Sequence, residues 1–265
     1  MQTDQATPIL SMEGVSKTFT NLAGHPVHAL KPTTISVRPG EIVAVVGESG
    51  SGKSTLARVA LGLIEPDQGR VMVYGKDRAT LSAEDRKKYR AAIQPVFQDP
   101  GTSLNPRRSI KGLLAQASWG YKGDKREHAL DMLRRVGLRP EAEYLDRYPH
   151  QLSGGQRQRL AIARALAMEP SVIIADEPLS GADVSIRGQI LNLLLDIAQA
   201  RGVSYLMITH DISIARYFAD RVAVMKDGAV VEEGEAESVI ENPQHPYTQK
   251  LIGSVMRIKT PETGA

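Results

Sequence analysis

The sequence contains no cysteine, few aromatic residues and no long apolar run. Without cysteine the chain has no disulfide, no thiolate ligand for zinc or an iron–sulfur cluster and no cysteine nucleophile, which fits a reducing compartment. No stretch approaches the roughly 20 apolar residues of a membrane-spanning helix. Residues 1–8 lack the basic and apolar regions that direct export. We therefore expect any membrane attachment to run through another protein or a surface patch.

The chain also lacks a large imbalance of charge. Its 265 residues include 33 Lys and Arg against 30 Asp and Glu, a formal net charge of +3. A protein that binds nucleic acid through charge is usually more basic, so we expect no nucleic-acid partner. Apolar residues make up 42% of the chain, which is typical of a globular protein long enough to bury a large α/β core.

Apolar patterns along the chain predict an α/β fold. Residues 9–19 and 27–37 alternate apolar and polar side chains, as antiparallel strands do. Three continuous apolar runs, at residues 42–46, 172–175 and 203–209, are typical of strands buried on both faces of a parallel sheet. We therefore expect a core of mainly parallel sheet with an N-terminal antiparallel β subdomain.

Helical patterns separate the predicted strands. Helical periodicity follows Lys53, runs through residues 108–140 and recurs over residues 157–168 and 186–200. We expect one domain with an inserted helical subdomain and a short C-terminal extension. The boundaries we predict are 9–258 for the domain (core 9–98 and 166–240), about 99–165 for the insertion and 241–265 for the extension.

A glycine-rich segment lies between the strand predicted at residues 42–46 and the next helix. It matches the phosphate-binding pattern G-x-x-x-x-G-K-[ST] with Gly47, Glu48, Ser49, Gly50, Ser51, Gly52, Lys53, Ser54 and Thr55. Glycines let backbone N–H groups converge on phosphate oxygens, and the helix N-terminus adds partial positive charge. Lys53 would reach the β- and γ-phosphates, and the Ser54 hydroxyl could ligate Mg²⁺. The alternative is a glycine-rich turn without a ligand, and the flanking strand and helix disfavour it.

Two acidic residues end the apolar run at residues 172–175. Asp176 and Glu177 would lie at the carboxyl end of a buried strand, where α/β sheets place ligands. Asp176 would hold Mg²⁺, directly or through water, and Glu177 would orient or deprotonate the water that attacks the γ-phosphate. An isolated Asp-Glu pair is commonly a solvated turn, but the glycine-rich segment upstream favours the nucleotide interpretation.

A third motif, Leu152-Ser153-Gly154-Gly155-Gln156, precedes a helical run and presents a second anion-ready helix N-terminus. Together with the glycine-rich segment before it and the Asp-Glu pair after it, this motif makes a three-part signal. Here the sequence resembles the ATP-binding cassette (ABC) ATPase family, whose signature these five residues match. The resemblance covers roughly residues 9–256.

The resemblance implies roles for further residues. Gln98, in Val-Phe-Gln-Asp-Pro, matches the glutamine that senses Mg²⁺ and the attacking water and links to the transmembrane partner. His210 matches the switch histidine that contacts the γ-phosphate, and Phe19 the aromatic residue that stacks on adenine. Asp183 matches the D-loop aspartate, although Gly-Ala stands before it where Ala-Leu is usual. Singly, Phe19 could be a core residue, Gln98 a polar loop residue and His210 a satisfied histidine at a strand end.

In this family two ATPase domains face each other head to tail. Each ATP lies between the glycine-rich loop of one domain and the signature of the other, which here comprises Ser153, Gly154, Gly155 and Gln156. The chain has one loop and one signature, so the resemblance implies a second ATPase subunit. ATP and Mg²⁺ are the implied cofactors, and Lys53, Gln98, Glu177 and His210 the implied catalytic residues.

Three phrases, at residues 96–107, 183–194 and 245–251, resemble the dipeptide, oligopeptide and nickel importer ATPases. The cysteine-rich iron–sulfur segment of many such proteins is excluded, since the chain has no cysteine. The resemblance implies a peripheral subunit at the cytoplasmic face of the inner membrane. Its partners would be a homologous ATPase subunit, two permease subunits and, indirectly, an extracytoplasmic solute-binding protein.

Two alternatives to di- and oligopeptide uptake stay open. Within the same subfamily the cargo could be nickel or another small solute, because the ATPase does not touch the cargo. In a different class, the chain could be a soluble ABC ATPase of the iron–sulfur assembly type, which has a suitable length. The phrases at residues 96–107 and 245–251 speak against this second alternative.

Overall fold

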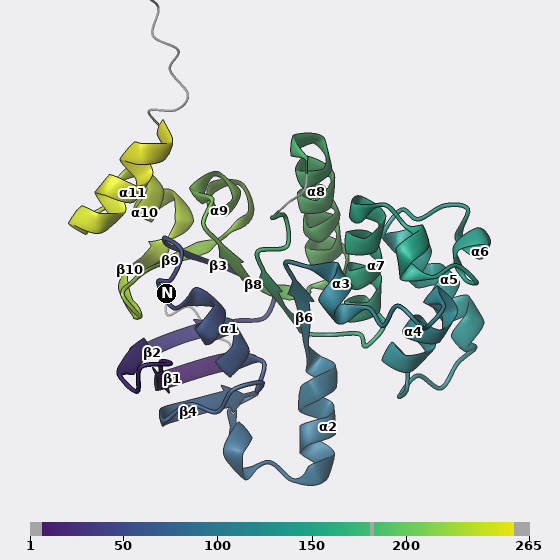
Figure 1. Ribbon diagram of the computed structural model, residues 1–265, viewed down its shortest axis with the longest axis horizontal. Coiled ribbons are helices and arrows are strands. Elements are labelled where there is room, and N and C mark those ends of the chain that lie inside the picture. The colour runs from purple at the N-terminus through teal and green to yellow at the C-terminus, as the bar shows by residue number, and fades with distance from the viewer. Residues whose placement is uncertain (1–6, 181–182, 257–265) are drawn as a thin grey trace, which may run out of the picture. The chain divides into compact units, whose positions relative to one another are not determined.

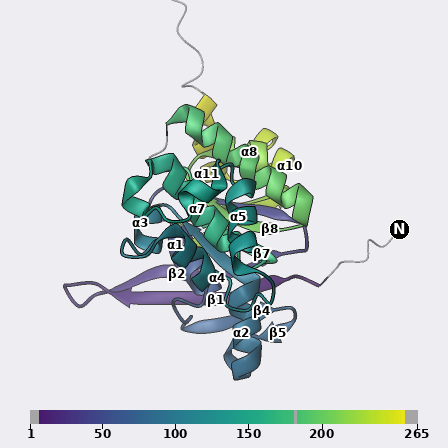
Figure 2. The same cartoon turned by 90° about the vertical axis from the view of Figure 1, so that its right-hand side faces the viewer.

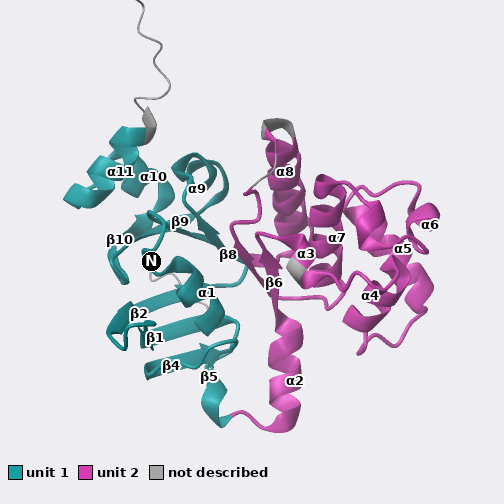
Figure 3. Cartoon of the chain, viewed as in Figure 1, with its two compact units in different colours: residues 1–80, 205–265 teal, residues 81–204 magenta. Residues whose placement is uncertain are grey.

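The computed structural model describes residues 7–180 and 183–256. The chain divides into two compact units, which Figure 3 shows in different colours. Unit 1 consists of residues 1–80 and 205–265, and unit 2 of residues 81–204. Both units combine strands with helices, and strands of one sheet in unit 1 are antiparallel while those of the other are mainly parallel. The predicted α/β class is confirmed.

The N-terminal part of unit 1 is an antiparallel sheet. Its strands, in spatial order, are β2 (Pro26–Val37), β1 (Leu10–Thr20), β4 (Gln68–Val73) and β5 (Lys76–Asp77). Figure 2 shows β1 beside β2, and Met12 of β1 pairs with Ile35 of β2 and with Val71 of β4. These three side chains are buried, so the predicted period of two does place one face of the sheet in a core.

A second set of strands in unit 1 is mainly parallel. In it, β3 (Ile42–Val46) pairs in parallel with β8 (Ser204–Thr209) and with β9 (Arg221–Lys226), and β10 (Ala229–Glu235) pairs antiparallel with β9. All five residues of β3 are buried, as the continuous apolar run predicted. The hairpin between β9 and β10 turns at Asp227 and Gly228, both in the left-handed region with φ of 48° and 80°.

Unit 1 also contains four α-helices within its described residues. They are α1 (Lys53–Ala60), α9 (Ile212–Phe218), α10 (Ala236–Glu241) and α11 (Pro246–Met256) (Figure 1). Helix α1 ends before the apolar periodicity of the sequence does, because Gly62 adopts φ +71°. The Gly62 N–H donates to the Val59 carbonyl and the Leu63 N–H to the Arg58 carbonyl, which is a Schellman end.

Unit 2 holds two parallel strands and most of the helices. Residue Ile93 of β6 (Ile93–Phe97) pairs with Val172 of β7 (Val172–Asp176), and the pairing continues to Phe97 and Asp176. The main elements of unit 2 are β6 (Ile93–Phe97), β7 (Val172–Asp176), α2 (Ala83–Ala92), α3 (Pro100–Ser103), α4 (Ile110–Ala117), α5 (Lys125–Arg135), α6 (Glu141–Tyr144), α7 (Gly154–Leu166) and α8 (Val184–Arg201). Within residues 7–180 and 183–256, none of the helices has both the length and the apolar character needed to cross a bilayer.

The helical pattern predicted at residues 108–140 is interrupted. Helix α4 starts after Ser109, whose hydroxyl accepts from the Gly112 N–H, and α5 starts after Asp124, whose carboxylate accepts from the Glu127 N–H. Gly120 and Gly123 lie between the two helices, where glycine disfavours a continuous helix. Helices α4 and α5 both pack on α7 and fix its position within unit 2.

Candidate functional site

The glycine-rich segment connects β3 to α1 in unit 1, as the strand, loop and helix pattern predicted. Gly52 caps the helix with φ 102°, and a Cβ atom there would lie 2.4 Å from the Ala29 carbonyl oxygen. A Cβ atom at Gly47 would lie 2.2 Å from the Met225 carbonyl oxygen. Both positions require glycine because backbone from other strands occupies the space that a side chain would need.

The Lys53 side chain folds back into this loop and is only 5% exposed. Its Nζ donates to the carbonyl oxygens of Gly47 and Glu48, each at 2.8 Å, and to the Ser51 hydroxyl at 3.3 Å. These oxygens provide the hydrogen bonds that a buried ammonium group needs. The loop therefore holds a positive charge at a helix N-terminus, an arrangement suited to a phosphate group.

Other predicted residues of unit 1 lie around the same edge of the sheet. Val46 and Thr209 are partners in the parallel pairing of β3 and β8, so Gly47 and His210 leave the sheet side by side. The side chains of His210 and Ser54 are exposed. The structure thus brings the predicted switch histidine to the edge from which the glycine-rich loop emerges.

Phe19 lies near the end of β1 and is 39% exposed. It is therefore not a core residue, which removes the structural alternative for this position. The Lys17 Nζ lies 5.9 Å from the centre of the ring, and Phe19 pairs with Val27 across the strands. An exposed ring held on a strand can stack on a flat heteroaromatic group.

In unit 2 the parallel pairing of β6 and β7 places the predicted catalytic groups at one sheet edge. Phe97 and Asp176 are partners, so Gln98 and Glu177 follow them at the carboxyl ends of adjacent strands. Glu177 adopts φ 47°, in the left-handed region that non-glycine residues rarely occupy. The Ser180 N–H donates to the Glu177 carbonyl oxygen at 3.1 Å and closes the turn. Strained backbone of this kind clusters at functional sites.

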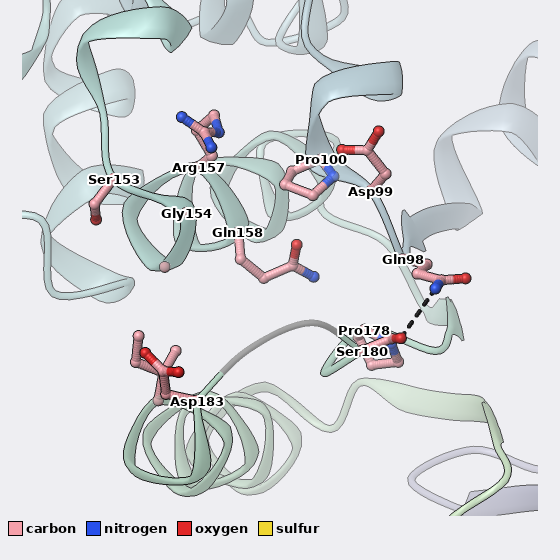
Figure 4. A pocket seen from close by; sticks show the side chains of 12 residues that line it. Gln98, Asp99, Pro100, Ser153, Gly154, Arg157, Gln158, Pro178, Ser180 and Asp183 are labelled. Carbon is pink, nitrogen blue, oxygen red and sulfur yellow. Dashed lines mark hydrogen bonds between the residues drawn. The ribbon is translucent and has the colours of Figure 1, made fainter.

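The Gln98 side chain makes a hydrogen bond that the sequence did not predict. Its Nε2 donates to the Ser180 hydroxyl at 2.9 Å, as the dashed line in Figure 4 shows. Ser180 comes three residues after Glu177, and no spacing rule marks it. The bond joins the segment after β6 to the segment that leads from the Asp-Glu pair toward Asp183.

The signature residues begin helix α7. The Ser153 hydroxyl accepts from the Gln156 N–H at 3.3 Å, and the Gln156 side-chain oxygen accepts from the Ser153 N–H at 3.0 Å, which is a capping box. A Cβ atom at Gly155 would lie 3.3 Å from a methyl carbon of Ile186. At Gly154, which is exposed, a Cβ atom would meet no atom of the described residues within 4 Å.

Unit 2 contains a pocket of about 530 Å³ beside Gln98, the start of α7 and Asp183 (Figure 4). Its lining combines residues from the Gln98 segment, the signature helix and the segment around Asp183. Gln158 projects into it from α7 and is 7% exposed, and its Nε2 has no hydrogen-bond partner among the described residues. A glutamine at a buried position of an otherwise apolar helix face is the signal that could have identified it. Gly181 and Ala182, which carry the departure from the usual D-loop, lie outside the described residues.

The donor groups present can be related to the predicted metal. Among the described residues there is no group of three or more His, Cys, Asp or Glu side chains that could hold a metal ion. The predicted Mg²⁺ ligands Ser54, Gln98 and Asp176 instead offer one hydroxyl, one amide and one carboxylate oxygen. Such a sparse set of oxygen donors fits Mg²⁺, which usually keeps waters and binds together with substrate phosphates.

The fold and these motifs define a P-loop nucleotide-binding protein with a cassette signature. A match over residues 30–180 to the family described as ABC transporter makes the identification specific. The chain belongs to the ABC transporter family. Residues 231–265 match the family described as the C-terminal region of oligopeptide and dipeptide transporters. Both resemblances seen in the sequence are confirmed.

Two relatives of this chain are named as import ATP-binding proteins. The chain is 46% identical over 261 residues to the glutathione import ATP-binding protein GsiA of Salmonella typhi, a match that covers 95% of this chain and 42% of that protein. It therefore spans less than half the length of that relative. It is 42% identical over 253 residues to a putative peptide import ATP-binding protein of Brucella ovis, covering 94% of this chain and 79% of the relative.

Solved structures of similar fold are ATP-binding cassettes. The dimeric post-hydrolysis state of the cassette MJ0796, bound to ADP and Pi, superposes with a TM-score of 0.76 at 32% identity, over 86% of this chain and 98% of that one. The structure of cbiO1 from Clostridium perfringens, part of the ABC transporter complex cbiONQ, gives a TM-score of 0.77 at 31% identity over 96% of each chain.

Proposed function

We propose that this chain is the ATP-binding subunit of an ABC importer and hydrolyses ATP to drive uptake of di- and oligopeptides through a partner permease. The observation that carries the proposal is the combination, in one chain, of a cassette with the C-terminal region of oligopeptide and dipeptide transporters. The names of the relatives support the same cargo class, since glutathione is itself a short peptide. The C-terminal match also favours an importer over a soluble ATPase of iron–sulfur assembly.

The residues that we assign to ATP hydrolysis occur in both units. In unit 1 the loop at residues 47–55 would hold the phosphates, with Lys53 and His210 directed to the γ-phosphate and Phe19 to the adenine. In unit 2 Glu177 would orient the attacking water and accept its proton. The support for this assignment is that Gly47 and His210 in unit 1, and Gln98 and Glu177 in unit 2, follow the carboxyl ends of parallel strands, where α/β proteins bind ligands.

Magnesium would bind together with the nucleotide. The Ser54 hydroxyl, the Asp176 carboxylate and the Gln98 amide oxygen are the groups we assign to it, the carboxylate directly or through water. When bound, the ion offsets the negative charge of the phosphate oxygens. The bond from Gln98 to Ser180 uses the amide nitrogen Nε2, so a role of the amide oxygen toward the ion is compatible with that bond.

A second ATPase subunit would complete each site. Gly154 supports this part of the proposal, because nothing in the described residues requires glycine there, whereas a molecule approaching the start of α7 from outside would. Ser153, Gly154, Gly155 and Gln156 would then face a nucleotide held by the partner's loop. We propose a homologous, non-identical partner, as in the importers whose phrases this chain shares.

The remaining partners would be two permease subunits and, through them, an extracytoplasmic solute-binding protein. The chain would be peripheral, at the cytoplasmic face of the inner membrane. Fractionation of cells tests this placement. We expect the chain in washed membranes together with two multi-spanning proteins. A wholly soluble complex with scaffold proteins would instead support the iron–sulfur assembly class.

Uptake in cells tests the cargo. Cells that lack the gene should lose uptake of labelled di- and tripeptides, and the unaltered gene should restore it. A gene encoding Lys53→Met should fail to do so, whereas Lys31→Met, a change at an exposed lysine of the same unit, should succeed. Loss of nickel uptake with peptide uptake intact would contradict the peptide assignment and favour the nickel alternative.

A further inference from the structure

Two distant segments hold the glycine-rich loop from outside. The Gly228 N–H, from the hairpin after β9, donates to the Ser51 carbonyl oxygen at 3.0 Å. The Glu48 N–H donates to the Tyr247 hydroxyl oxygen at 3.1 Å, across 199 positions of sequence. Tyr247 lies in the first turn of α11 and belongs to the phrase His245-Pro-Tyr-Thr. The sequence pattern alone predicts no chemical role for this phrase.

The Tyr247 side chain is fixed in place by its surroundings. It is 8% exposed, and the Lys226 Nζ lies 5.1 Å from the centre of its ring. The Tyr247 N–H donates to Nδ1 of His245 at 3.1 Å. The Glu232 carboxylate accepts from the Gln244 N–H at 2.8 Å and from the His245 N–H at 3.0 Å, which anchors the start of the segment to β10. The hydroxyl therefore occupies a defined position beside the loop.

The bond from Glu48 acts on a single peptide plane. The Glu48 N–H and the Gly47 carbonyl belong to the same planar peptide unit, in which the two groups point in opposite directions. The Gly47 carbonyl oxygen accepts from the Lys53 Nζ at 2.8 Å. A hydrogen bond that fixes the N–H end of this plane therefore also fixes the carbonyl end, which holds the lysine.

We propose that Tyr247 is a positioning residue for the phosphate-binding loop, and that through it the C-terminal helix α11 sets the affinity of the loop for nucleotide. The inference rests on the proposed role of residues 47–55 in binding phosphates. By linkage the effect is reciprocal, so that a nucleotide bound at the loop also stabilises the docked position of α11. The C-terminal region that marks this subfamily would thereby help to position the nucleotide-binding loop of the ATPase.

The variant Tyr247→Phe tests the proposal because it removes the hydroxyl and keeps the ring beside Lys226. We expect the Kd for N-methylanthraniloyl-ATP with Mg²⁺, measured by fluorescence, to rise about three- to tenfold, the value of one hydrogen bond. The KM for ATP should rise by the same factor with kcat nearly unchanged. The control Tyr217→Phe removes the hydroxyl of an exposed tyrosine in the same unit and should leave both constants unchanged.

A second readout separates positioning from plain stability. In hydrogen–deuterium exchange of the unaltered chain, nucleotide should increase the protection of amides in residues 246–256, and in Tyr247→Phe this increase should be smaller. A purely structural role would lower the unfolding temperature of Tyr247→Phe and leave its Kd equal to that of the unaltered chain, which would overturn the proposal. If the unaltered chain itself fails to bind the nucleotide, the proposed function fails instead.

Discussion

The glycines at the two candidate phosphate-facing helix ends differ in what surrounds them. In unit 1, Gly47 and Gly52 lie against carbonyl oxygens of Met225 and Ala29, so the chain's own backbone excludes a side chain. In unit 2, Gly154 faces open space within the described residues. Contacts within unit 1 thus explain the glycines of its loop, whereas no contact among the described residues explains Gly154 of unit 2.

The polar side chains of the two units also differ in how they are held by contacts within their own unit. Lys53 of unit 1 is buried and held by three oxygen acceptors of its own loop. Glu177 of unit 2 lies at a strand end with strained backbone, and Gln98 is attached to a neighbouring turn. Lys53 therefore lies in a preformed set of hydrogen bonds within unit 1, whereas the side chain of Gln98 in unit 2 is bonded to a neighbouring turn. Four substitutions can test this division, beginning with the largest expected effect.

Replacing Glu177 with Gln should separate binding from turnover. The change removes the carboxylate that we assign to the attacking water, so kcat for ATP hydrolysis should fall about 10²- to 10⁴-fold. The Kd for ATP, which depends on unit 1, should stay the same. Glu169→Gln is a matched control, because Glu169 is an exposed glutamate of unit 2 with φ 51°. Hydrolysis by Glu177→Gln at the parental rate would contradict the assignment.

Replacing Lys53 with Met should have the opposite signature. Loss of a charge-assisted hydrogen bond to phosphate should raise the Kd for ATP about tenfold to a hundredfold, as isothermal titration calorimetry can measure. Lys31→Met, at an exposed site of the same unit, should bind ATP normally. Equal affinities of the two variants would mean that unit 1 is not the phosphate receptor.

Replacing Gly154 with Ala should impair assembly while leaving the fold of the chain intact. A methyl group there meets nothing in the described residues but would crowd a partner's nucleotide, with a loss of about tenfold in ATP-dependent dimerisation. Gly188→Ala places the same methyl group in open space on α8 and should leave dimerisation unchanged. Analytical ultracentrifugation of each variant, mixed with the homologous partner subunit and ATP, compares the two. An unimpaired Gly154→Ala dimer would remove the reason for placing the signature in a shared site.

Replacing Glu232 with Gln should have the smallest effect, and one that depends on pH. Burial raises the pKa of Glu232, but hydrogen bonds from the N–H groups of Gln244 and His245 outweigh it, and the net pKa lies below its ordinary value. The carboxylate therefore stabilises the fold above the unfolded pKa of about 4.3, and this contribution is lost as the pH falls through the lower folded pKa.

At neutral pH the unfolding temperature of Glu232→Gln should thus be lower by about 2–4 °C, and the difference should disappear in acid. Glu237→Gln, at an exposed site on α10, should match the unaltered chain at every pH. A difference that persists unchanged below the folded pKa would show that the charge of Glu232 does not anchor the segment. This prediction tests the anchoring of the segment that holds Tyr247. It therefore applies the comparison of the two units to the part of unit 1 that supports the glycine-rich loop.

Local pattern was sufficient to predict much of the fold. The apolar run at residues 42–46, the glycines after it and the helix that follows were predictable because strand, turn and helix each have their own period and breaker residues. The signature was predicted as a capped helix start, and Ser153 does cap α7, although the helix begins at Gly154 rather than Arg157. Within the helical insertion the pattern alone did not resolve the two glycines that divide α4 from α5.

Long-range polar contacts could not be predicted in the same way. The bond from Gln98 to Ser180 and the bond from Glu48 to Tyr247 span 82 and 199 positions of sequence. No periodicity carries information over such separations, because the meeting of two loops depends on the packing of the strands and helices between them. The assignment of individual site residues remains a prediction, since motif order gives roles but not the hydrogen bonds that hold each side chain.

The capping box at Ser153 leaves the serine with an unused capacity. A hydroxyl group has two lone pairs and one hydrogen. The cap uses one lone pair of the Ser153 oxygen, which accepts a hydrogen bond from the Gln156 N–H. The hydrogen can still be donated to an oxygen atom that arrives from outside the chain. The Ser153 oxygen can therefore accept the capping hydrogen bond while its O–H group donates to an oxyanion. The helix would keep its cap when such an oxyanion binds.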